Sequence, residues 1–312
     1  MKIDLEETTK LTVLVSGASG LIGARLCSVL KARGHVVRTL SRSKGDVTWD
    51  LERGVLDAGA MDGVDVVVHL AGEPVAQRWT SKVKRRILDS RVKSTQLLVS
   101  AALRQRKMPA LVMASGSNFY GYERAGYVDE KTEAGKGFLA DVCVEWEAAA
   151  KPLWSTGGRV VYMRTGMVLS QNGGALAKML PPFQLGLGGR IGSGEQRISW
   201  VGLDDLVAMY CLAIESPEVS GPVNAVAPGA VTNLEFTRTL AHLLNRPAVI
   251  PVPKAMIHLL FGEMGKETVL ADVALVPMRL QECGFKWKTP SLEKALKVAL
   301  KQVELSSTRT SS

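Results

Sequence analysis

Three glycines spaced three residues apart follow a short apolar run near the start of the chain and could hold a phosphate group. The run is residues 11–15, and Gly17, Gly20 and Gly23 follow it as GxxGxxG. Gly17 allows a tight turn, Gly20 lets backbone N–H groups approach a pyrophosphate, and Gly23 lets a helix pack close to a sheet. The alternative is a nucleotide-free turn that needs its glycines for geometry alone.

The elements that must position these glycines form a strand, a turn, a helix and a second strand. Residues 21–33 carry apolar side chains at helical spacing, Gly34 is a helix stop, and residues 35–40 are rich in β-branched residues. Strand, glycine turn, helix and strand within about 30 residues are typical of a dinucleotide-binding βαβ unit. The predicted cofactor contacts in this unit are Gly17, Ser19, Gly20, Leu21, Ile22 and Gly23.

The end of the second strand indicates which dinucleotide fits. An NAD site usually places an acidic residue about 20 residues after the turn. Here the chain has Ser41, Arg42, Ser43 and Lys44, with no acid. Two hydroxyls and two cations suit a 2′-phosphate. We therefore expect NADP(H), held in part by Ser41 and Arg42, although these cations could instead belong to a solvated loop.

Composition narrows the class of protein. The chain has 312 residues, 46% of them hydrophobic, which allows a packed core in one large domain or in a domain plus a lobe. No apolar run reaches the roughly 18 residues of a membrane span, and the acidic N-terminus is not a signal peptide. Four scattered cysteines fit reduced thiols in the cytoplasm. They show no zinc spacing, the histidines show no ligand spacing, and no metal site is predicted.

The net charge of +9 raises nucleic acid as a partner. The basic residues lie mostly within predicted amphipathic helices and have few aromatic residues between them. Solvated helix faces explain this pattern better than a nucleic-acid surface does. We therefore expect no nucleic-acid and no membrane partner, and the oligomeric state stays open.

Strands and helices alternate through the first half of the chain. Further strands are predicted at 46–50, 65–70, 110–114 and 159–164, and helices at 80–106 and 137–154. This alternation predicts an α/β fold with a Rossmann-type, doubly wound parallel sheet. The cofactor domain is predicted at 11–165, with segments near 195–230 returning to it.

The pattern changes after Thr165. A glycine-rich stretch, 173–194, contains Pro181 and Pro182 and interrupts the alternation. Helices are predicted at 204–215, 232–244, 254–261 and 291–300, with a strand at 223–226, and the start of the helix at 232 resembles a capping box. Residues 166–303 are predicted to form mainly a smaller α/β lobe on the substrate side, and 304–312 a disordered tail.

Several blocks give the chain a resemblance to a known family. They include SGASGLIG at 16–23, LAGEP at 70–74, and a long glycine-rich block at 173–201. With these blocks the chain resembles the atypical, extended branch of the short-chain dehydrogenases/reductases. More narrowly, it resembles epimerase-family proteins that carry a C-terminal domain of unknown function. The resemblance implies an NADP(H)-binding Rossmann domain with a C-terminal lobe over a cleft, and no settled reaction.

Further cofactor contacts are expected where the third and fifth buried strands end. Small residues after the strand at 65–70 let backbone meet a cofactor. Glu73 could face the nicotinamide, or it could pair with Arg78. The predicted contacts are Leu70, Ala71, Gly72, Glu73 and Arg164.

The usual catalytic pair of the resembled superfamily is missing. Its Tyr and Lys stand as YxxxK on one helix, so that both side chains lie on one face and the Lys lowers the phenol pKa. No Tyr precedes a Lys by four in the matching helix, where Cys143 takes the place of the Lys. Candidate replacements are Ser115, Tyr120 and Cys143, although Tyr120 could be a core residue and Cys143 a small buried one.

The sequence favours an NADP(H)-binding, oxidoreductase-like protein with a small-molecule substrate. Arg190 or Arg197, in the glycine-rich block, would suit an anionic substrate. Two alternatives stay open. The missing pair favours a non-catalytic NADPH-binding regulator, and the superfamily also contains epimerases and dehydratases that act on sugar nucleotides.

Overall fold

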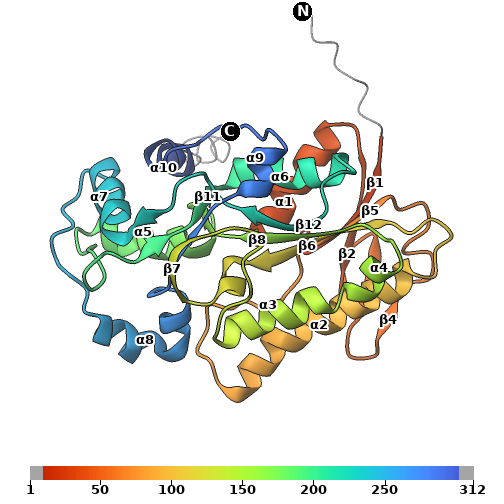
Figure 1. Ribbon diagram of the computed structural model, residues 1–312, viewed down its shortest axis with the longest axis horizontal. Helices are drawn as coiled ribbons and strands as arrows, with labels where there is room; N and C mark the ends of the chain where they lie inside the picture. Colours follow the sequence, from red (N-terminus) through yellow and green to blue (C-terminus); the bar gives the residue numbers. More distant parts are fainter. Residues whose placement is uncertain (1–9, 302–312) are drawn as a thin grey trace, which may run out of the picture.

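A sheet of eight strands forms the centre of the computed structural model, which describes residues 10–301 (Figure 1). The strand order is β12-β8-β6-β5-β1-β2-β3-β4, parallel except for the β3–β4 hairpin at one edge. This arrangement is the Rossmann-type α/β fold that the sequence predicts. The strands are β1 Thr12–Ser16, β2 Val36–Ser41, β3 Val47–Asp50, β4 Val55–Leu56, β5 Val66–His69, β6 Ala110–Gly116, β8 Val160–Thr165 and β12 Gly221–Ala225.

Helices cover both faces of the sheet (Figure 1). Helices α1 (Leu21–Ala32) and α6 (Leu203–Glu215) pack on one face, and α2 (Ser81–Ala102), α3 (Phe138–Ala148) and α4 (Lys151–Ser155) lie on the other. Alternation along β1 explains the two cores. Val13 and Val15 belong to the cluster with α1 and α6, whereas Leu14 belongs to the cluster with α2. A strand buried on both faces reads as a continuous apolar run.

A further hydrophobic core, outside the main sheet, packs around the buried side chains Trp200, Phe236 and Leu296. It is built by α5, α7 and α10 with short strands, and α8 lies near it at the same end of the molecule (Figure 1). The elements outside the main sheet are η1 Ser117–Tyr120, β7 Glu123–Val128, β9 Met167–Leu169, α5 Gly174–Gln184, β10 Arg197–Ile198, β11 Trp200–Gly202, β13 Val231–Thr232, α7 Asn233–Leu243, α8 Lys254–Glu267, β14 Asp272–Leu275, α9 Met278–Glu282 and α10 Leu292–Lys301.

The glycine-rich stretch holds a helix that the sequence did not predict. Helix α5 runs through Pro181 and Pro182, each of which lacks the N–H that a helix needs. Its side chains Leu176, Leu180 and Phe183 are buried. Tertiary packing of this apolar face therefore outweighs the local cost of the prolines.

Other boundaries also differ from the predictions. The helix predicted at 137–154 is two helices, α3 and α4, with Pro152 near the start of the second. Helix α8 extends past 261 through a kink at Gly262, and β4 and β7 were not predicted. The cap predicted at 232 is present, because the Thr232 hydroxyl accepts a hydrogen bond from the Glu235 N–H at 3.1 Å. The tail predicted at 304–312 lies outside the described residues.

None of the helices within 10–301 combines the length and apolarity needed to cross a membrane.

Candidate functional site

The glycine turn sits at the carboxyl end of β1 and leaves no room for side chains. Gly17 has a φ of +72°, and a Cβ atom there would lie 2.8 Å from the Leu70 carbonyl carbon. A Cβ atom at Gly23 would lie 2.2 Å from the Gly17 carbonyl oxygen. Gly17 thus allows the turn to pack on the end of β5, and Gly23 allows α1 to pack on the turn.

The start of α1 has the features of an anion site. Gly20 is the N-cap of the helix, and no side chain caps it. Ser19 and Gly20 are exposed, Leu21 and Ile22 are half-buried, and Gly23 is buried. The first N–H groups of the helix and its positive dipole end are therefore directed at this exposed turn.

The end of β2 lies beside the glycine turn, because β1 and β2 are parallel neighbours. The Ser41 hydroxyl accepts hydrogen bonds from the N–H groups of Ser43 and Lys44 at 3.2 and 2.8 Å, which shapes the loop. Arg42 and Lys44 are exposed. The structure places both cations at the carboxyl edge of the sheet, on one side of the glycine turn.

The loop after β5 lies on the other side of the turn. Leu70 and Ala71 are half-buried, and Gly72 is exposed. The Glu73 carboxylate accepts a hydrogen bond from Gln77 at 3.1 Å and pairs with Arg86 at 3.4 Å. Arg86, on α2, is therefore its ionic partner, and the alternative pairing with Arg78 is wrong.

A buried histidine joins β1, β5 and α2 beneath this loop. His69 Nδ1 lies 2.6 Å from the Ser16 hydroxyl oxygen, and Nε2 lies 2.9 Å from that of Ser94. The Ser94 hydroxyl donates to the Ser90 carbonyl at 2.6 Å, so it accepts from His69 Nε2–H. Ser16 then donates to Nδ1 while it accepts from the Leu70 N–H at 3.2 Å. This pattern requires a neutral ring.

The histidine makes stability depend on pH. Burial, assisted by the charge of Arg91, lowers the pKa of His69 from 6.5 to about 3. At a pH between the two pKa values, His69 is protonated in the unfolded chain and neutral in the folded chain. The contribution of His69 to the free energy of unfolding is therefore fully present above its unfolded pKa and is lost as the pH falls toward its folded pKa. Between about pH 6.5 and 4.5, the stability advantage of the native protein over His69→Gln should shrink by about 2–3 kcal/mol. Urea unfolding of both proteins across this range tests this, and parallel stability curves would contradict it.

Ser115, Tyr120 and Arg164 belong to one buried polar network. Ser115 on β6 and Arg164 on β8 are direct register partners. Glu147 on α3 joins them: its carboxylate accepts from the Ser115 hydroxyl at 2.7 Å and from Arg164 Nε and Nη2 at 3.0 and 2.8 Å. Arg164 Nη1 donates to the Tyr120 hydroxyl at 3.0 Å, and that hydroxyl donates to Asn224 at 2.7 Å.

The network leaves its members with little proton-transfer capacity. Tyr120 is fully buried, and burial raises the pKa of its hydroxyl to about 12 against the opposing charge of Arg164. Burial alone would lower the pKa of Arg164, but the hydrogen bonds and charges of Glu147 and Tyr120 together outweigh burial and raise it. The Ser115 proton is directed at the Glu147 carboxylate. In this arrangement Ser115 can accept a hydrogen bond from a ligand but does not donate one.

Cys143 lies next to this network on α3. Its thiol contacts the Gly116 carbonyl oxygen at 3.9 Å. Burial, followed by the charge of Glu147, raises the pKa of the Cys143 thiol to about 11. The thiol is therefore neutral at neutral pH, and it is not the cation that a YxxxK helix would place there.

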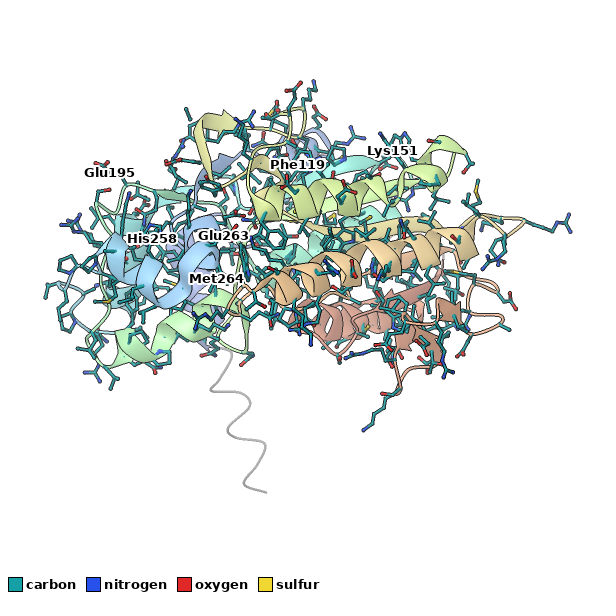
Figure 2. All side chains as sticks on the ribbon, turned by 90° about the horizontal axis from the view of Figure 1, so that it is seen from below. Phe119, Lys151, Glu195, His258, Glu263 and Met264 are labelled. Atoms are coloured by element: carbon teal, nitrogen blue, oxygen red, sulfur yellow. The ribbon has the colours of Figure 1, made fainter. Side chains whose placement is uncertain are left out.

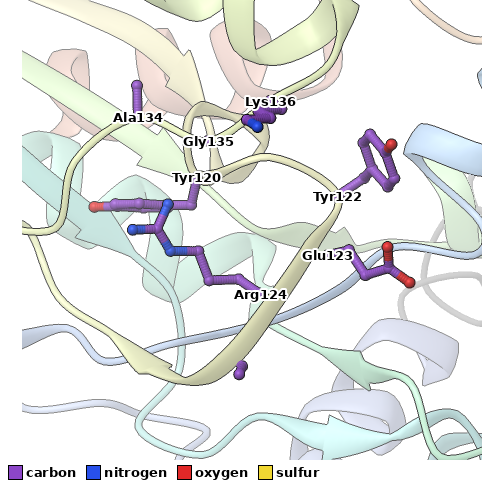
Figure 3. A pocket seen from close by; sticks show the side chains of 8 residues that line it. Tyr120, Tyr122, Glu123, Arg124, Ala134, Gly135 and Lys136 are labelled. Carbon is purple, nitrogen blue, oxygen red and sulfur yellow. The ribbon is translucent and has the colours of Figure 1, made fainter.

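An open pocket of about 440 Å³ lies beside η1 and β7 (Figure 3). Of the predicted catalytic residues, only Tyr120 lines it, together with residues that include Tyr122, Arg124 and Lys136. None of the glycine-turn residues lines it. Its charged and aromatic lining suits a small ligand, and the pocket lies past the carboxyl end of β6, two strands away from the glycine turn on β1.

Helix α8 fastens the start of α3, which the sequence did not indicate. The buried Glu267 carboxylate accepts from the N–H groups of Phe138 and Leu139 at 2.9 and 2.8 Å. Glu263, one turn earlier, pairs with Lys84 on α2 at 2.5 Å. Figure 2 shows α8, with His258, Glu263 and Met264 labelled, beside the ends of α2 and α3. Glu267 therefore caps the start of α3, although it lies about 130 residues later in the sequence.

Helix α5 approaches the site from the other lobe. Lys178 donates to the Ala76 carbonyl at 3.4 Å, and the backbone at Gly173 lies beside the Leu21 side chain. Arg197 instead pairs with Asp272 at 2.7 Å, and Arg190 donates to the Gly192 and Ser193 carbonyls at 2.7 and 3.1 Å. The start of α5, rather than these two arginines, therefore borders the glycine turn.

A parallel sheet wound on both faces, with a glycine turn at its first βα junction, defines a Rossmann-type protein. The chain belongs to the NAD dependent epimerase/dehydratase family, whose model matches residues 13–227; a domain of unknown function, DUF1731, matches 252–299. It is 40% identical to the epimerase family protein Mb2239 of Mycobacterium bovis over 289 residues, 91% of this chain and 96% of that protein. The human epimerase family protein SDR39U1 is 38% identical over 292 residues, which cover 91% of this chain and 98% of that protein.

A solved structure supports the same relationship. The crystal structure of human SDR39U1 (isoform 2) with NADPH matches this chain with a TM-score of 0.85 and 36% identity. The match covers 93% of this chain and 100% of that one.

Proposed function

We propose that this protein binds NADP(H) and acts as an oxidoreductase on a small molecule. The glycine turn carries the proposal, because a side chain at Gly17 or Gly23 would collide with backbone while the uncapped start of α1 stays exposed. The NADPH in the structure of a 36% identical relative supports it. The turn would hold the pyrophosphate, Ser41 and Arg42 the 2′-phosphate, and residues 70–72 the nucleoside beyond the turn. Bound NADPH would supply hydride, and the protein would orient it.

The phosphate preference is the direct test. Arg42→Ala removes an exposed guanidinium that has no ionic partner within 10–301. We expect it to weaken NADPH binding by about tenfold or more and to leave NADH binding unchanged, because only NADPH has the 2′-phosphate. Calorimetric titration with both nucleotides measures this.

Arg104→Ala is the matched control, because Arg104 is exposed just after α2, toward the opposite edge of the sheet. It should alter neither affinity. Equal affinity of the native protein for NADPH and NADH would contradict the assignment of Arg42.

The substrate would lie between the strand edge and the start of α5. The Lys178 ammonium and the N-terminal end of α5, capped by Gly173, offer positive charge there, which suits an anionic substrate. The test is to incubate the protein and NADPH with a panel of carbonyl compounds, some with a carboxylate and some without. This panel tests both the oxidoreductase activity and the preference for an anionic substrate. Oxidation of NADPH should be fastest with the anionic members.

A non-catalytic NADPH-binding role is the second candidate. The Ser115 hydroxyl donates to Glu147 at 2.7 Å, and Cys143 holds a neutral thiol where the usual Lys would stand. The tyrosine that usually donates the proton is missing from α3, and neither Ser115 nor Cys143 replaces it as a donor in this arrangement. NADPH binding without turnover across the panel would favour this candidate. A sugar-nucleotide epimerase would instead retain a non-exchanging NAD through purification, which absorbance of the purified protein would reveal.

The proposed compartment is the cytoplasm. All four cysteines are free, and three of them are buried. Reduced thiols suit a reducing compartment. Imaging of the tagged protein in its own cell tests this location.

A further inference from the structure

Arg91 on α2 is a cation without an ion-pair partner among residues 10–301, and it lies close to the proposed cofactor site. Its Nη1 atom donates to the carbonyl oxygens of Glu73 and Ile87, both at 3.0 Å. A Cβ atom at Gly72 would lie 3.1 Å from Arg91 Cζ. On its other side the guanidinium carbon lies 5.0 Å from the centre of the Trp146 ring. The guanidinium is therefore held between the loop after β5 and helix α3.

The charge of Arg91 is not neutralised by an ion pair in the part of the chain that the structure describes. No ion pair within 10–301 includes it. Glu73 is the acidic residue whose charge acts on it, but the Glu73 carboxylate is bound to Gln77 and Arg86. Desolvating a guanidinium without a carboxylate is costly unless its remaining donors find acceptors. No hydrogen bond within 10–301 uses Nε or Nη2. A ligand would provide acceptors for these donors.

Arg91 lies close to the part of α3 where the usual catalytic cation is missing. Trp146, which it stacks on, lies one helical turn after Cys143, where the usual Lys would stand. The Arg91 charge also reaches both the Cys143 thiol and His69. A positive charge is thus brought to the ends of β5 and β6 from α2 instead of α3.

We propose that Arg91 binds the hydroxyl groups of the nicotinamide-side ribose of NADP(H) and replaces the lysine that α3 lacks. This inference rests on the proposed function. The strand order β2-β1-β5-β6 sets the direction of the cofactor: Arg42 at β2 faces the 2′-phosphate, the turn at β1 holds the pyrophosphate, and Arg91 meets what lies beyond it, at β5. The nicotinamide-side ribose offers hydroxyl oxygens to guanidinium donors at that point.

Two ligands separate this role from a structural one. Adenosine 2′,5′-bisphosphate shares the adenine half of NADPH and lacks the nicotinamide riboside. Arg91→Gln should weaken NADPH binding by about tenfold or more, because charge-assisted hydrogen bonds are lost, and should leave the bisphosphate affinity unchanged. Arg42→Ala should weaken both. Arg85→Gln, the same change at an exposed position of α2, should weaken neither.

The two affinities also show which idea fails. An Arg91→Gln protein that binds both ligands as the native protein does, or that loses affinity for both equally, overturns the role of Arg91. A native protein that binds neither ligand overturns the proposed function, and this inference with it. If Arg91→Gln does not fold, Arg91→Lys keeps the charge but loses the fork of donors, and the same selective loss of NADPH affinity is expected.

Moving the charge back gives a second test. Arg91→Asn combined with Cys143→Lys returns the cation to α3. The double variant should recover much of the NADPH affinity that Arg91→Asn alone loses. A folded double variant that binds NADPH no better than Arg91→Asn would contradict the replacement.

Discussion

Replacing Gly23 with alanine is expected to weaken NADPH binding by roughly a hundredfold and to lower the free energy of unfolding by about 2–3 kcal/mol. The new Cβ atom would lie 2.2 Å from the Gly17 carbonyl oxygen. That oxygen belongs to the backbone, and it also accepts from the Gly20 N–H at 3.0 Å. The collision must therefore move either α1 or the turn. Both changes misdirect the N–H groups that would hold the pyrophosphate, and about two charge-assisted hydrogen bonds would be lost.

Two further alanine variants separate folding from binding. Nothing lies within 4 Å of a Cβ atom at Gly229, so Gly229→Ala should change neither quantity. At Gly20 the new Cβ atom would be 3.3 Å from the Gly17 oxygen, which is tight but tolerable. Gly20→Ala should therefore fold and still lose NADPH affinity. Urea unfolding and fluorescence titration measure the two effects, and a Gly23→Ala protein with native stability and affinity would refute the assigned geometry.

The local parts of the site could be predicted from the sequence because neighbouring residues determine them. The glycine turn needs only the spacing of Gly17, Gly20 and Gly23 after an apolar run. The exposed position of Arg42 follows from its place at the end of a strand that pairs with β1. The absence of the Tyr and Lys pair was equally readable, because both would stand on one helix.

The partners of these residues could not be predicted, because they come from distant segments. The Ser115 hydroxyl donates to Glu147, 32 residues away, and Tyr120 donates to Asn224, 104 residues away. Nothing in the local pattern around Glu147 marks it as buried, although it lies one turn after Cys143 on the same helix. Glu267 as the cap of α3 has no sequence signal at all. Long-range packing decides which polar side chains meet, and periodicity carries no information about it.

Packing also explains the wrong element predictions. The prolines of α5 argue against a helix locally, yet the buried face of that helix determines the outcome. Helix α5 brings Lys178 to the loop after β5, so this correction concerns the site as well as the fold.

Glu147→Gln is expected to lower the free energy of unfolding by about 3–5 kcal/mol, because it leaves the buried Arg164 charge without its counter-ion. Glu147 and Arg164 are 9% and 5% exposed, and their two hydrogen bonds are 3.0 and 2.8 Å long. Glu145→Gln is the matched control: it is the same change on the same helix, at an exposed position without an ion pair within 10–301. Denaturant unfolding of the three proteins measures the difference, and equal stability of the two variants would show that the ion pair is dispensable.

Removing both charges should be much less harmful than removing one. Glu147→Leu with Arg164→Met buries apolar groups of similar size, so most of the lost stability should return. Tyr120 keeps its bond to Asn224 in this variant, and Ser115 is released from Glu147. NADPH binding should persist, because the glycine turn, Arg42 and Arg91 take no part in the network. A stable double variant that no longer binds NADPH would instead show that the network positions the cofactor, in agreement with the cofactor contact predicted for Arg164 at the end of β8.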